Sequence, residues 1–321
     1  MKGARHVFRF LAEAQRRGER TALVTLTDVI GSSSRSPGTH MGVSETGASI
    51  GSFSGGCVEA AVVAEARRII AEDRAELVRF GAGSPYIDIR LPCGGGIDLL
   101  FTPLRTTATL DRAADLLEQR QAVTLRLDTG GELALYQGPA LASAEQGFSV
   151  RHDPDLRVII LGHGAEPLAL ARQVLAFGAD PLLLSPDRTL LDEARRLGVA
   201  CDLLRTPGRS AHLATADALT AIVFLFHDHD WEPDLLVQAL EGEAFYIGAM
   251  GSRATQARRT AELAERRLTP SIIARIAGPI GLIPAARDPD TLALSVMAEL
   301  VASHTGTVGA DGLRSSRPTT N

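Results

Sequence analysis

The sequence predicts an α/β protein, in which an N-terminal mixed α+β module precedes a Rossmann-like module with a doubly wound parallel sheet. In the second half, apolar segments such as RVIILG (157–162) and AIVFLF (221–226) alternate with amphipathic stretches such as EPLALARQVLAFGA (166–179). Buried strands alternating with such helices are typical of a parallel sheet covered on both faces. The first half lacks this alternation and is rich in glycine turns, so we expect a separate mixed module there.

The first module is assigned to residues 1–153. Val7, Phe8, Leu11 and Ala12 share one face of an expected N-terminal helix, and a β-branched strand over 21–31 follows it. A Ser/Gly/Pro loop (32–40) then leads to short strands and to a helix from Cys57 to about Asp73. The remaining elements expected here are strands at 76–80, 86–90 and 97–104, a helix at 109–121 and a hairpin at 123–136.

The second module is assigned to residues 154–303. After the first strand and helix we expect a strand at 181–186, a helix at 190–198, and a strand at 221–226. A helix at 234–241, a strand at 244–248, a helix from about 253 and a closing helix capped by Asp288 complete the module. Residues 304–321 are low in apolar content, so they are expected to form a disordered tail.

Composition excludes several functional classes. The net charge of −5 and the lack of a polybasic cluster argue against nucleic-acid and membrane partners. No apolar run approaches the roughly 18 residues of a membrane span, and the N-terminus lacks a signal-peptide pattern, so we expect a cytoplasmic protein. Lys2 is the only lysine, which argues against Schiff-base catalysis and against a P-loop.

The first strand of the second module ends in a glycine turn. Gly162 and Gly164 would let backbone amides at a helix start approach a phosphate. Pro167 replaces the third glycine of the dinucleotide fingerprint, and Ser185 stands where an NAD-binding acid is usual, with Asp187 two residues later. These differences argue against NAD(P), while binding of a phosphate or another nucleotide and an empty Rossmann scaffold both stay open.

Two further strand ends carry polar groups. His227 and His229 would share one face of an extended segment, so they could bind a ligand or, less readily, a metal. Gly251, Ser252 and Arg253 combine a glycine turn, a hydroxyl and a guanidinium at a helix start, which suits an anion. The alternatives are solvated charges and a capped helix with exposed arginines.

Glycine-rich segments of the first module surround two thiols. Gly55 and Gly56 precede Cys57, while Gly94 and Gly95 follow Cys93. Glycine permits close approach of a bulky ligand, so these cysteines are candidates to lie beside one, with buried packing as the alternative. Ser33 and Arg35 add a hydroxyl and a guanidinium from the preceding loop. The third cysteine is Cys201, and this odd number without an export signal argues against a disulfide framework.

From about residue 8 to residue 303 the sequence resembles the XdhC/CoxI family of accessory proteins for molybdenum hydroxylases. The resemblance is carried by seven segments in order: GSSSRSPGTHM, IGSFSGGCVEAAV, LPCGGGIDLL, the LGHG turn, the FH of FLFHDHD, YIGAMGSRATQARR, and PIGL followed by ARDPDTLALSVMAELVA. It implies a chaperone that holds molybdenum cofactor during sulfuration and delivers it to an apo-hydroxylase of the xanthine dehydrogenase or aldehyde oxidoreductase type. Implied partners are this hydroxylase and a cysteine desulfurase, and we expect a homodimer.

The resemblance also assigns roles to residues. Cys57 and Cys93 match the family's two glycine-flanked cysteines and would contact the cofactor, while no residue is expected to be catalytic. Ser34, Ser185 and the segment 283–285 depart from the family pattern, which suggests a subgroup that handles the cytosine dinucleotide form rather than plain molybdopterin. The alternatives are an oxidoreductase using NAD(P) or flavin in the Rossmann-like module, and an interaction scaffold with an empty crevice.

Overall fold

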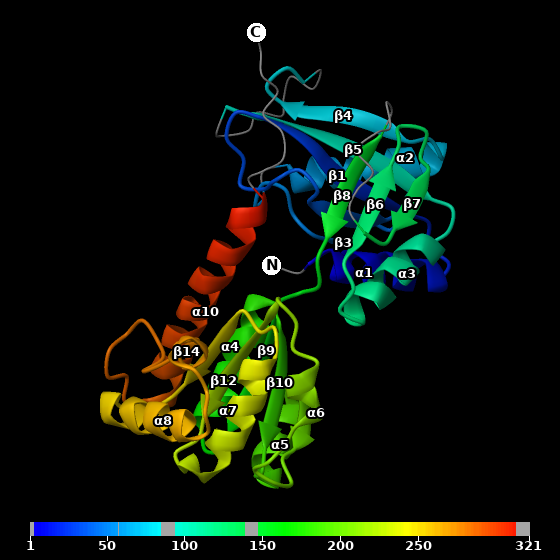
Figure 1. Ribbon diagram of the computed structural model, residues 1–321. Coiled ribbons are helices and arrows are strands. Elements are labelled where there is room, and N and C mark those ends of the chain that lie inside the picture. The colour runs from blue at the N-terminus through cyan, green and yellow to red at the C-terminus, as the bar shows by residue number, and fades with distance from the viewer. Residues whose placement is uncertain (1–2, 57, 85–93, 139–146, 313–321) are drawn as a thin grey trace. The chain divides into compact units, whose positions relative to one another are not determined.

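The computed structural model describes residues 3–56, 58–84, 94–138 and 147–312. The chain folds as two compact units, Met1–Pro154 and Asp155–Asn321. Strands and helices mix in both units, and the second contains a six-stranded parallel sheet, so the predicted α/β class is confirmed (Figure 1). Within the described residues, no helix has the length and apolar character needed to cross a membrane.

The first unit contains an antiparallel five-stranded sheet and a smaller three-stranded sheet. Its elements are α1 (Ala4–Arg16), β1 (Thr21–Ile30), β2 (His40–Ser44), β3 (Ser49–Ile50), α2 (Glu59–Glu72), β4 (Glu76–Gly81), β5 (Gly96–Leu104), α3 (Ala108–Glu118), β6 (Val123–Leu127), β7 (Leu133–Tyr136) and β8 (Phe148–His152). The larger sheet has the order β3-β2-β1-β5-β4, and the smaller has the order β7-β6-β8. The predicted hairpin over 123–136 is confirmed, whereas the strand expected at 86–90 lies outside the described residues.

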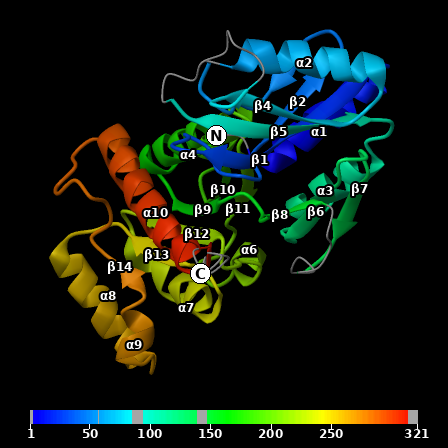
Figure 2. The ribbon, with the colours of Figure 1, turned by 90° about the horizontal axis from the view of Figure 1, so that it is seen from above.

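Helices pack on both faces of the five-stranded sheet because successive strand residues point to opposite sides. Val24 and Leu26 of β1 pack against the apolar face of α2, whereas Leu23 packs against α1 and α3. The α1 residues expected to share a face, Val7, Phe8, Leu11 and Ala12, are all buried. The result is one core on each side of the sheet, and Figure 2 shows helices α2 and α3 on its opposite sides.

The second unit alternates strands and helices, as the periodicity predicts. Its elements are β9 (Arg157–Gly162), α4 (Glu166–Phe177), β10 (Asp180–Ser185), α5 (Arg188–Arg196), β11 (Ala200–Leu203), α6 (Ala211–Ala214), β12 (Thr220–Leu225), the 3-10 helix η1 (His229–Trp231), α7 (Glu232–Glu241), β13 (Tyr246–Ala249), α8 (Arg253–Glu265), α9 (Pro270–Ile273), β14 (Ile276–Ala277) and α10 (Pro289–Gly312). The six strands pair in parallel in the order β11-β10-β9-β12-β13-β14. Numbered from β9, this is the order 3-2-1-4-5-6 of a Rossmann fold, whose ligand crevice lies where the order reverses.

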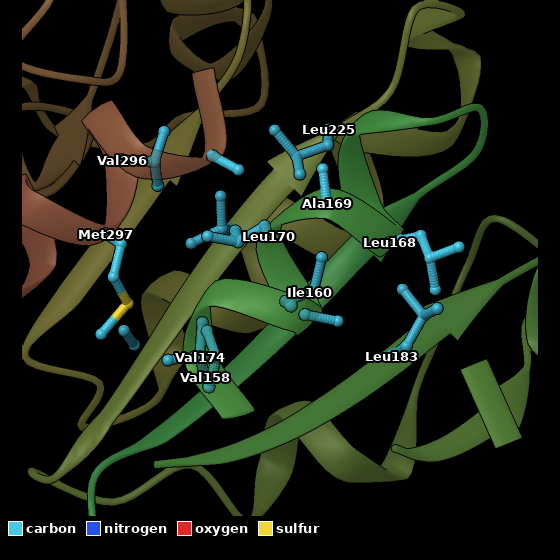
Figure 3. Close-up of a cluster of buried hydrophobic side chains, with 14 of the residues drawn as sticks. Val158, Ile160, Leu168, Ala169, Leu170, Val174, Leu183, Leu225, Val296 and Met297 are labelled. Carbon is cyan, nitrogen blue, oxygen red and sulfur yellow. The ribbon is translucent and has the colours of Figure 1, made fainter. Parts of the chain in front are cut away.

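Two cores cover the faces of the parallel sheet. Val158 and Ile160 of β9 point toward α4, α5 and α10, while Ile159 and Leu161 point toward α6, α7, α8 and α9. Figure 3 shows the first of these cores, where Val296 and Met297 of α10 approach the α4 side chains. Every position of β9 after its first is buried, which accounts for its apolar run in place of an alternating pattern.

The disordered tail expected from residue 304 is corrected in part. Helix α10 continues to Gly312, and the Thr305 hydroxyl donates to the carbonyl oxygens of Val301 (2.9 Å) and Ala302 (3.1 Å). A helix already nucleated by a packed stretch gains one backbone hydrogen bond per added residue, so it extends into a polar segment at little cost. Residues 313–321 lie outside the described residues.

Candidate functional site

Two of the motifs singled out in the first unit contact each other directly. Arg35 Nε donates to the carbonyl oxygen of Ser52 at 3.2 Å, and the Ser34 hydroxyl donates to that of Phe53 at 3.3 Å. The amide of Arg35 in turn donates to the Ser33 hydroxyl at 3.2 Å, which orders the loop that carries the guanidinium. The loop after β1 is therefore fastened to the segment that leads to α2.

The glycine-rich segment that follows Cys93 lies beside the loop that follows β1. Ile30, at the end of β1, pairs with Gly96 of β5, so Gly31 and Gly95 are the next residues along the two antiparallel strands. A Cβ atom placed on Gly31 would lie 3.5 Å from the Cα atom of Gly95, which is ordinary van der Waals contact. The residues that follow β1 thus touch both the segment before Cys57 and the segment after Cys93.

The segment before α2 is organised around one carboxylate. Glu59 Oε1 accepts hydrogen bonds from the Ser52 hydroxyl (2.8 Å) and from the amides of Phe53 (3.0 Å) and Ser54 (2.9 Å). Glu59 Oε2 accepts from the Ser54 hydroxyl (2.9 Å) and from the amides of Gly56 (2.8 Å) and Val58 (3.2 Å). A side chain of the first turn of α2 thereby fixes the backbone that precedes the helix.

These contacts keep Glu59 ionised. Partial burial alone would raise the pKa of this carboxyl group, but the amide of Ser54 and the hydroxyls of Ser52 and Ser54 outweigh burial. The pKa of Glu59 falls to about 2, so the carboxylate is a full anion at any physiological pH. The donors of this segment are consequently directed at a negative charge.

Glycines on both sides of this site face open space. Gly55 (φ +74°), Gly56 (φ +127°) and Gly94 (φ +69°) have left-handed backbone conformations, and a Cβ atom on any of them would meet no heavy atom of the described residues within 4 Å. The conformations favour glycine, whereas the space itself does not require it. A bulky ligand could therefore approach this backbone closely.

The predicted thiol contacts remain predictions, because Cys57 and Cys93 lie outside the described residues. The third cysteine, Cys201, lies on β11 in the other unit, and its thiol is 3.5 Å from the carbonyl oxygen of Leu191. Burial raises the pKa of the Cys201 thiol, which opposes its reactivity. Cys201 is therefore a suitable internal control for the other two.

In the second unit, three of the predicted residues meet at the point where the strand order reverses. Gly162 ends β9 so close to β12 that a Cβ atom would lie 2.4 Å from the carbonyl oxygen of Leu225. Gly164 (φ +91°) follows, and a Cβ atom there would lie 3.8 Å from the His227 ring. The residues that sequence placed at two separate strand ends are thus neighbours.

A carboxylate of the protein lies at the N-terminus of α4 and another at that of α5, the two helices whose starts would contact a bound dinucleotide. Glu166 lies in the first turn of α4, 3.2 Å from His227 Nε2. Asp187 caps α5, accepting from the amides of Thr189 (2.8 Å) and Leu190 (3.3 Å). The negative charge of Glu166 at the start of α4 would repel a phosphate there. The Asp187 carboxylate caps its own helix, so it is not directed at a ribose.

Gly251, Ser252 and Arg253 form the start of α8, after β13. Ser252 caps the helix by accepting from the amide of Thr255 at 3.1 Å, so its hydroxyl has a structural role. Arg253 is exposed. Since β9, β12 and β13 are parallel neighbours, this helix start lies on the same edge of the sheet as Gly162 and His227.

Arg253→Ala tests the anion site directly. If the guanidinium makes a charge-assisted hydrogen bond, the substitution should weaken binding of inorganic phosphate or cytidine diphosphate by about 1.5 to 3 kcal/mol. Calorimetric titration measures this difference, with Arg266→Ala, at the other end of α8, as the control. Equal affinities of Arg253→Ala and the unchanged protein for both ligands would remove Arg253 from the site.

The extended geometry expected after β12 is wrong. The strand ends at Leu225, and residues His229–Trp231 form the 3-10 helix η1. Asp228 Oδ1 accepts from the amide of Asp230 at 3.1 Å, a local turn contact that competes with extended structure. The argument that alternate histidines share a strand face therefore does not apply. In the described ranges, no three His, Cys, Asp or Glu residues are grouped to hold a metal ion.

Comparison with known proteins agrees with the motif pattern. The model of the XdhC and CoxI family matches residues 14–81, and that of the XdhC Rossmann domain matches residues 158–300. Over 298 residues the chain is 36% identical to the molybdenum cofactor insertion chaperone PaoD of Escherichia coli K12, covering 92% of this chain and 87% of that protein. The chain belongs to the XdhC and CoxI family.

A solved structure of the same fold covers almost the whole chain. The crystal structure of a protein described as a xanthine dehydrogenase from Bacillus halodurans superposes with a TM-score of 0.77, covering 98% of each chain at 21% identity. At this identity the likeness concerns the fold alone. It includes both units of this XdhC and CoxI family protein.

Sequence reasoning missed two features of this family member. The central role of Glu59 was not predicted, although the spacing from Gly56 to Glu59 matches the reach of a capping-box acid back to an amide three residues earlier. The pairing of His40 with His152, whose Nε2 atoms are 3.0 Å apart, joins residues 112 positions apart. No local pattern could have indicated that second contact.

Proposed function

We propose that this protein is a molybdenum cofactor chaperone that binds the cofactor as cargo and delivers it to an apo molybdenum hydroxylase. The observation that carries the proposal is the meeting of three glycine-rich motifs in the first unit. Ser34 and Arg35 donate hydrogen bonds to Phe53 and Ser52 on one side, and Gly31 lies beside Gly95 on the other. The name of the Escherichia coli relative, a molybdenum cofactor insertion chaperone, supports the same conclusion.

The residues present suit such a cargo. Arg35, half-buried beside Ser52, supplies a cation toward a phosphate-bearing ligand. Among the described residues nothing crowds the backbone of Gly55, Gly56 and Gly94, which suits a large heterocycle. Thiols are soft donors that suit a thiophilic metal, which gives Cys57 and Cys93 their proposed role beside the molybdenum centre. The site then binds and shields the cofactor without catalysing a reaction on it.

Several finer statements belong to the same proposal. The protein would hold the cofactor while its terminal sulfur is installed by a cysteine desulfurase, and would act in the cytoplasm as a homodimer. The client would be a hydroxylase of the xanthine dehydrogenase or aldehyde oxidoreductase type. The bound form would be molybdopterin or its cytosine dinucleotide, and affinity measurements with both forms would distinguish them.

The rival function is that of an oxidoreductase using NAD(P) or flavin. The 3-2-1-4-5-6 strand order favours it, because this topology forms a crevice at the strand reversal. Glu166 at the start of α4 and Asp187 in its capping role argue against it. Titration with NADH, NADPH and FAD decides between the two functions, since micromolar binding of any of them together with no binding of molybdenum cofactor would favour the rival.

Cys57→Ala and Cys93→Ala test the proposed site. Each single change should lower the molybdenum and pterin retained after anaerobic purification at least tenfold, because it removes a soft donor beside the metal. The melting temperature should change little. Metal analysis with pterin quantification measures retention, and near-equal amounts of both in the unchanged protein are required by the proposed function.

Cys201→Ala is the matched control and should retain cofactor normally. If both other alanine variants instead retain and deliver the cofactor as the unchanged protein does but melt several degrees lower, Cys57 and Cys93 are packing residues. Their assignment to the cofactor would then be abandoned.

A further inference from the structure

We propose that Glu59 is the positioning residue of the cofactor-binding surface, acting through residues 52–54, 56 and 58 without touching the cofactor. This inference rests on the proposed function and adds a residue to it. Arg35, Cys57 and Cys93 were singled out for possible contact with a ligand. Glu59 differs from them because its contacts are directed inward, at the segment that carries those groups.

The geometry accounts for this role. Among the described residues, Glu59 accepts six hydrogen bonds, three at each carboxylate oxygen, from donors of Ser52, Phe53, Ser54, Gly56 and Val58. A carboxylate has about four lone-pair sites, so six donors leave it no capacity for a ligand. The carboxylate of Glu59 therefore orders the protein and does not bind a ligand.

The segment that Glu59 orders could not hold this shape unaided. Gly55 and Gly56 have left-handed conformations, and among the described residues no side chain packs against the Cβ position of either. The amides of Gly56 and Val58, on either side of position 57, both donate to Glu59 Oε2. Glycine loses more conformational freedom on ordering than any other residue, and the carboxylate supplies the contacts that offset this loss.

The same anchor reaches the neighbouring motif. Ser52, whose hydroxyl donates to Glu59 Oε1, accepts the hydrogen bond of Arg35 through its carbonyl oxygen. Phe53, whose amide donates to the same oxygen, accepts from the Ser34 hydroxyl. One carboxylate consequently fixes the position of the Arg35 guanidinium relative to the amides of Gly56 and Val58.

Only a carboxylate with this reach fulfils the requirement. Glu59→Gln replaces one acceptor oxygen by an amide nitrogen, which donates and would oppose up to three of the donors. Glu59→Asp keeps the charge and both oxygens but is one methylene shorter. We therefore expect the glutamine variant to be the more damaging, and the aspartate variant to recover part of the loss.

The experiment measures cofactor affinity and local order in the full-length protein. Glu59→Gln should weaken binding of isolated molybdenum cofactor at least tenfold, and Glu59→Asp should be intermediate. In ligand-free Glu59→Gln, hydrogen exchange should accelerate at the amides of Phe53, Ser54, Gly56 and Val58, while the strands of the five-stranded sheet keep their protection. Glu72→Gln is the control, since Glu72 pairs with Arg68 on the same helix (2.7 Å) and does not contact this segment.

Three results would count against the inference. Unchanged cofactor affinity in Glu59→Gln would overturn it and leave the proposed function standing. Loss of affinity with protection lost throughout the first unit, without recovery in Glu59→Asp, would reduce Glu59 to a residue that stabilises the fold. Absence of cofactor binding by the unchanged protein would overturn the proposed function and this inference together.

Discussion

Glu232→Ala should lower the free energy of unfolding of the second unit by about 3 to 5 kcal/mol, because it leaves a buried guanidinium without its partner. Glu232 Oε2 accepts from Arg259 Nη2 at 2.8 Å and from Arg259 Nε at 3.0 Å, and the two side chains are 3% and 5% exposed. The guanidinium also donates to the Met250 carbonyl oxygen (2.9 Å) and to Gln256 Oε1 (2.6 Å). This pair joins α7, α8 and the end of β13.

Trp231 makes the measurement specific to this unit. It is the only tryptophan of the chain, precedes Glu232 and stacks on Phe226 with ring centroids 6.2 Å apart. Urea unfolding followed by its fluorescence reports the second unit without interference from the first. Glu262→Ala is the control, because its ion pair with Arg266 is exposed, and it should cost at most about 0.5 kcal/mol.

A double replacement separates the charge from the packing. Glu232→Leu combined with Arg259→Met removes both charges and keeps apolar volume, so its free energy of unfolding should lie near that of the unchanged protein. If Glu232→Ala itself costs less than about 1 kcal/mol, water reaches the guanidinium and the pair is not buried in solution.

Local patterns in the sequence were sufficient for most of the second unit. Val158 to Leu161 are apolar in succession because both faces of β9 are covered, and this run predicts a buried parallel strand. Gly162 could be singled out because the turn after such a strand needs a close backbone approach. The structure gives the reason as the Leu225 carbonyl oxygen of the neighbouring strand.

Contacts between distant segments could not be predicted in this way. Arg35 with Ser52 and Glu232 with Arg259 join residues that share no periodic relation, and their pairing depends on the tertiary fold. The extended geometry expected at His229 failed because a side-chain contact of Asp228 favours a turn. Arg35 and the glycine-flanked cysteines were proposed for the site from their local motifs, whereas Glu59 was missed, although its spacing from Gly56 offered a local signal.

Acid should destabilise the first unit through a pair of buried histidines. His40 on β2 and His152 on β8 share one hydrogen between Nε2 atoms 3.0 Å apart, and His40 Nδ1 is 2.8 Å from the Thr25 hydroxyl oxygen. Phe8 of α1 packs against both rings. This site is uncharged and would have to accept a buried charge on protonation.

The pKa values set the pH range of this effect. Burial lowers the pKa of His152 from its ordinary value of 6.5 to about 4, against a weaker opposite effect of Asp153. Burial, followed by repulsion from His152, holds the pKa of His40 well below the same ordinary value. Between pH 6.5 and pH 4 the unfolded chain therefore binds more protons than the folded protein, so stability falls as the pH falls.

His152 alone should reduce the free energy of unfolding by about 2 kcal/mol between pH 7 and pH 4.5, and His40 should add to this loss. The measurement stops at pH 4.5 so that only the histidines change their contribution. The pKa of Glu59 falls from 4.5 to about 2 on folding, so this carboxylate stabilises the first unit above pH 4.5 and loses that effect only at lower pH. Thermal unfolding followed by circular dichroism measures the change, and Trp231 fluorescence identifies the transition of the second unit. His152→Gln should flatten the pH dependence of the first unit's transition, whereas His212→Gln, at an exposed histidine 3.1 Å from Asp202, should not. Parallel loss of stability in the His152→Gln variant and the unchanged protein over this range would show that the pair does not titrate as its burial requires.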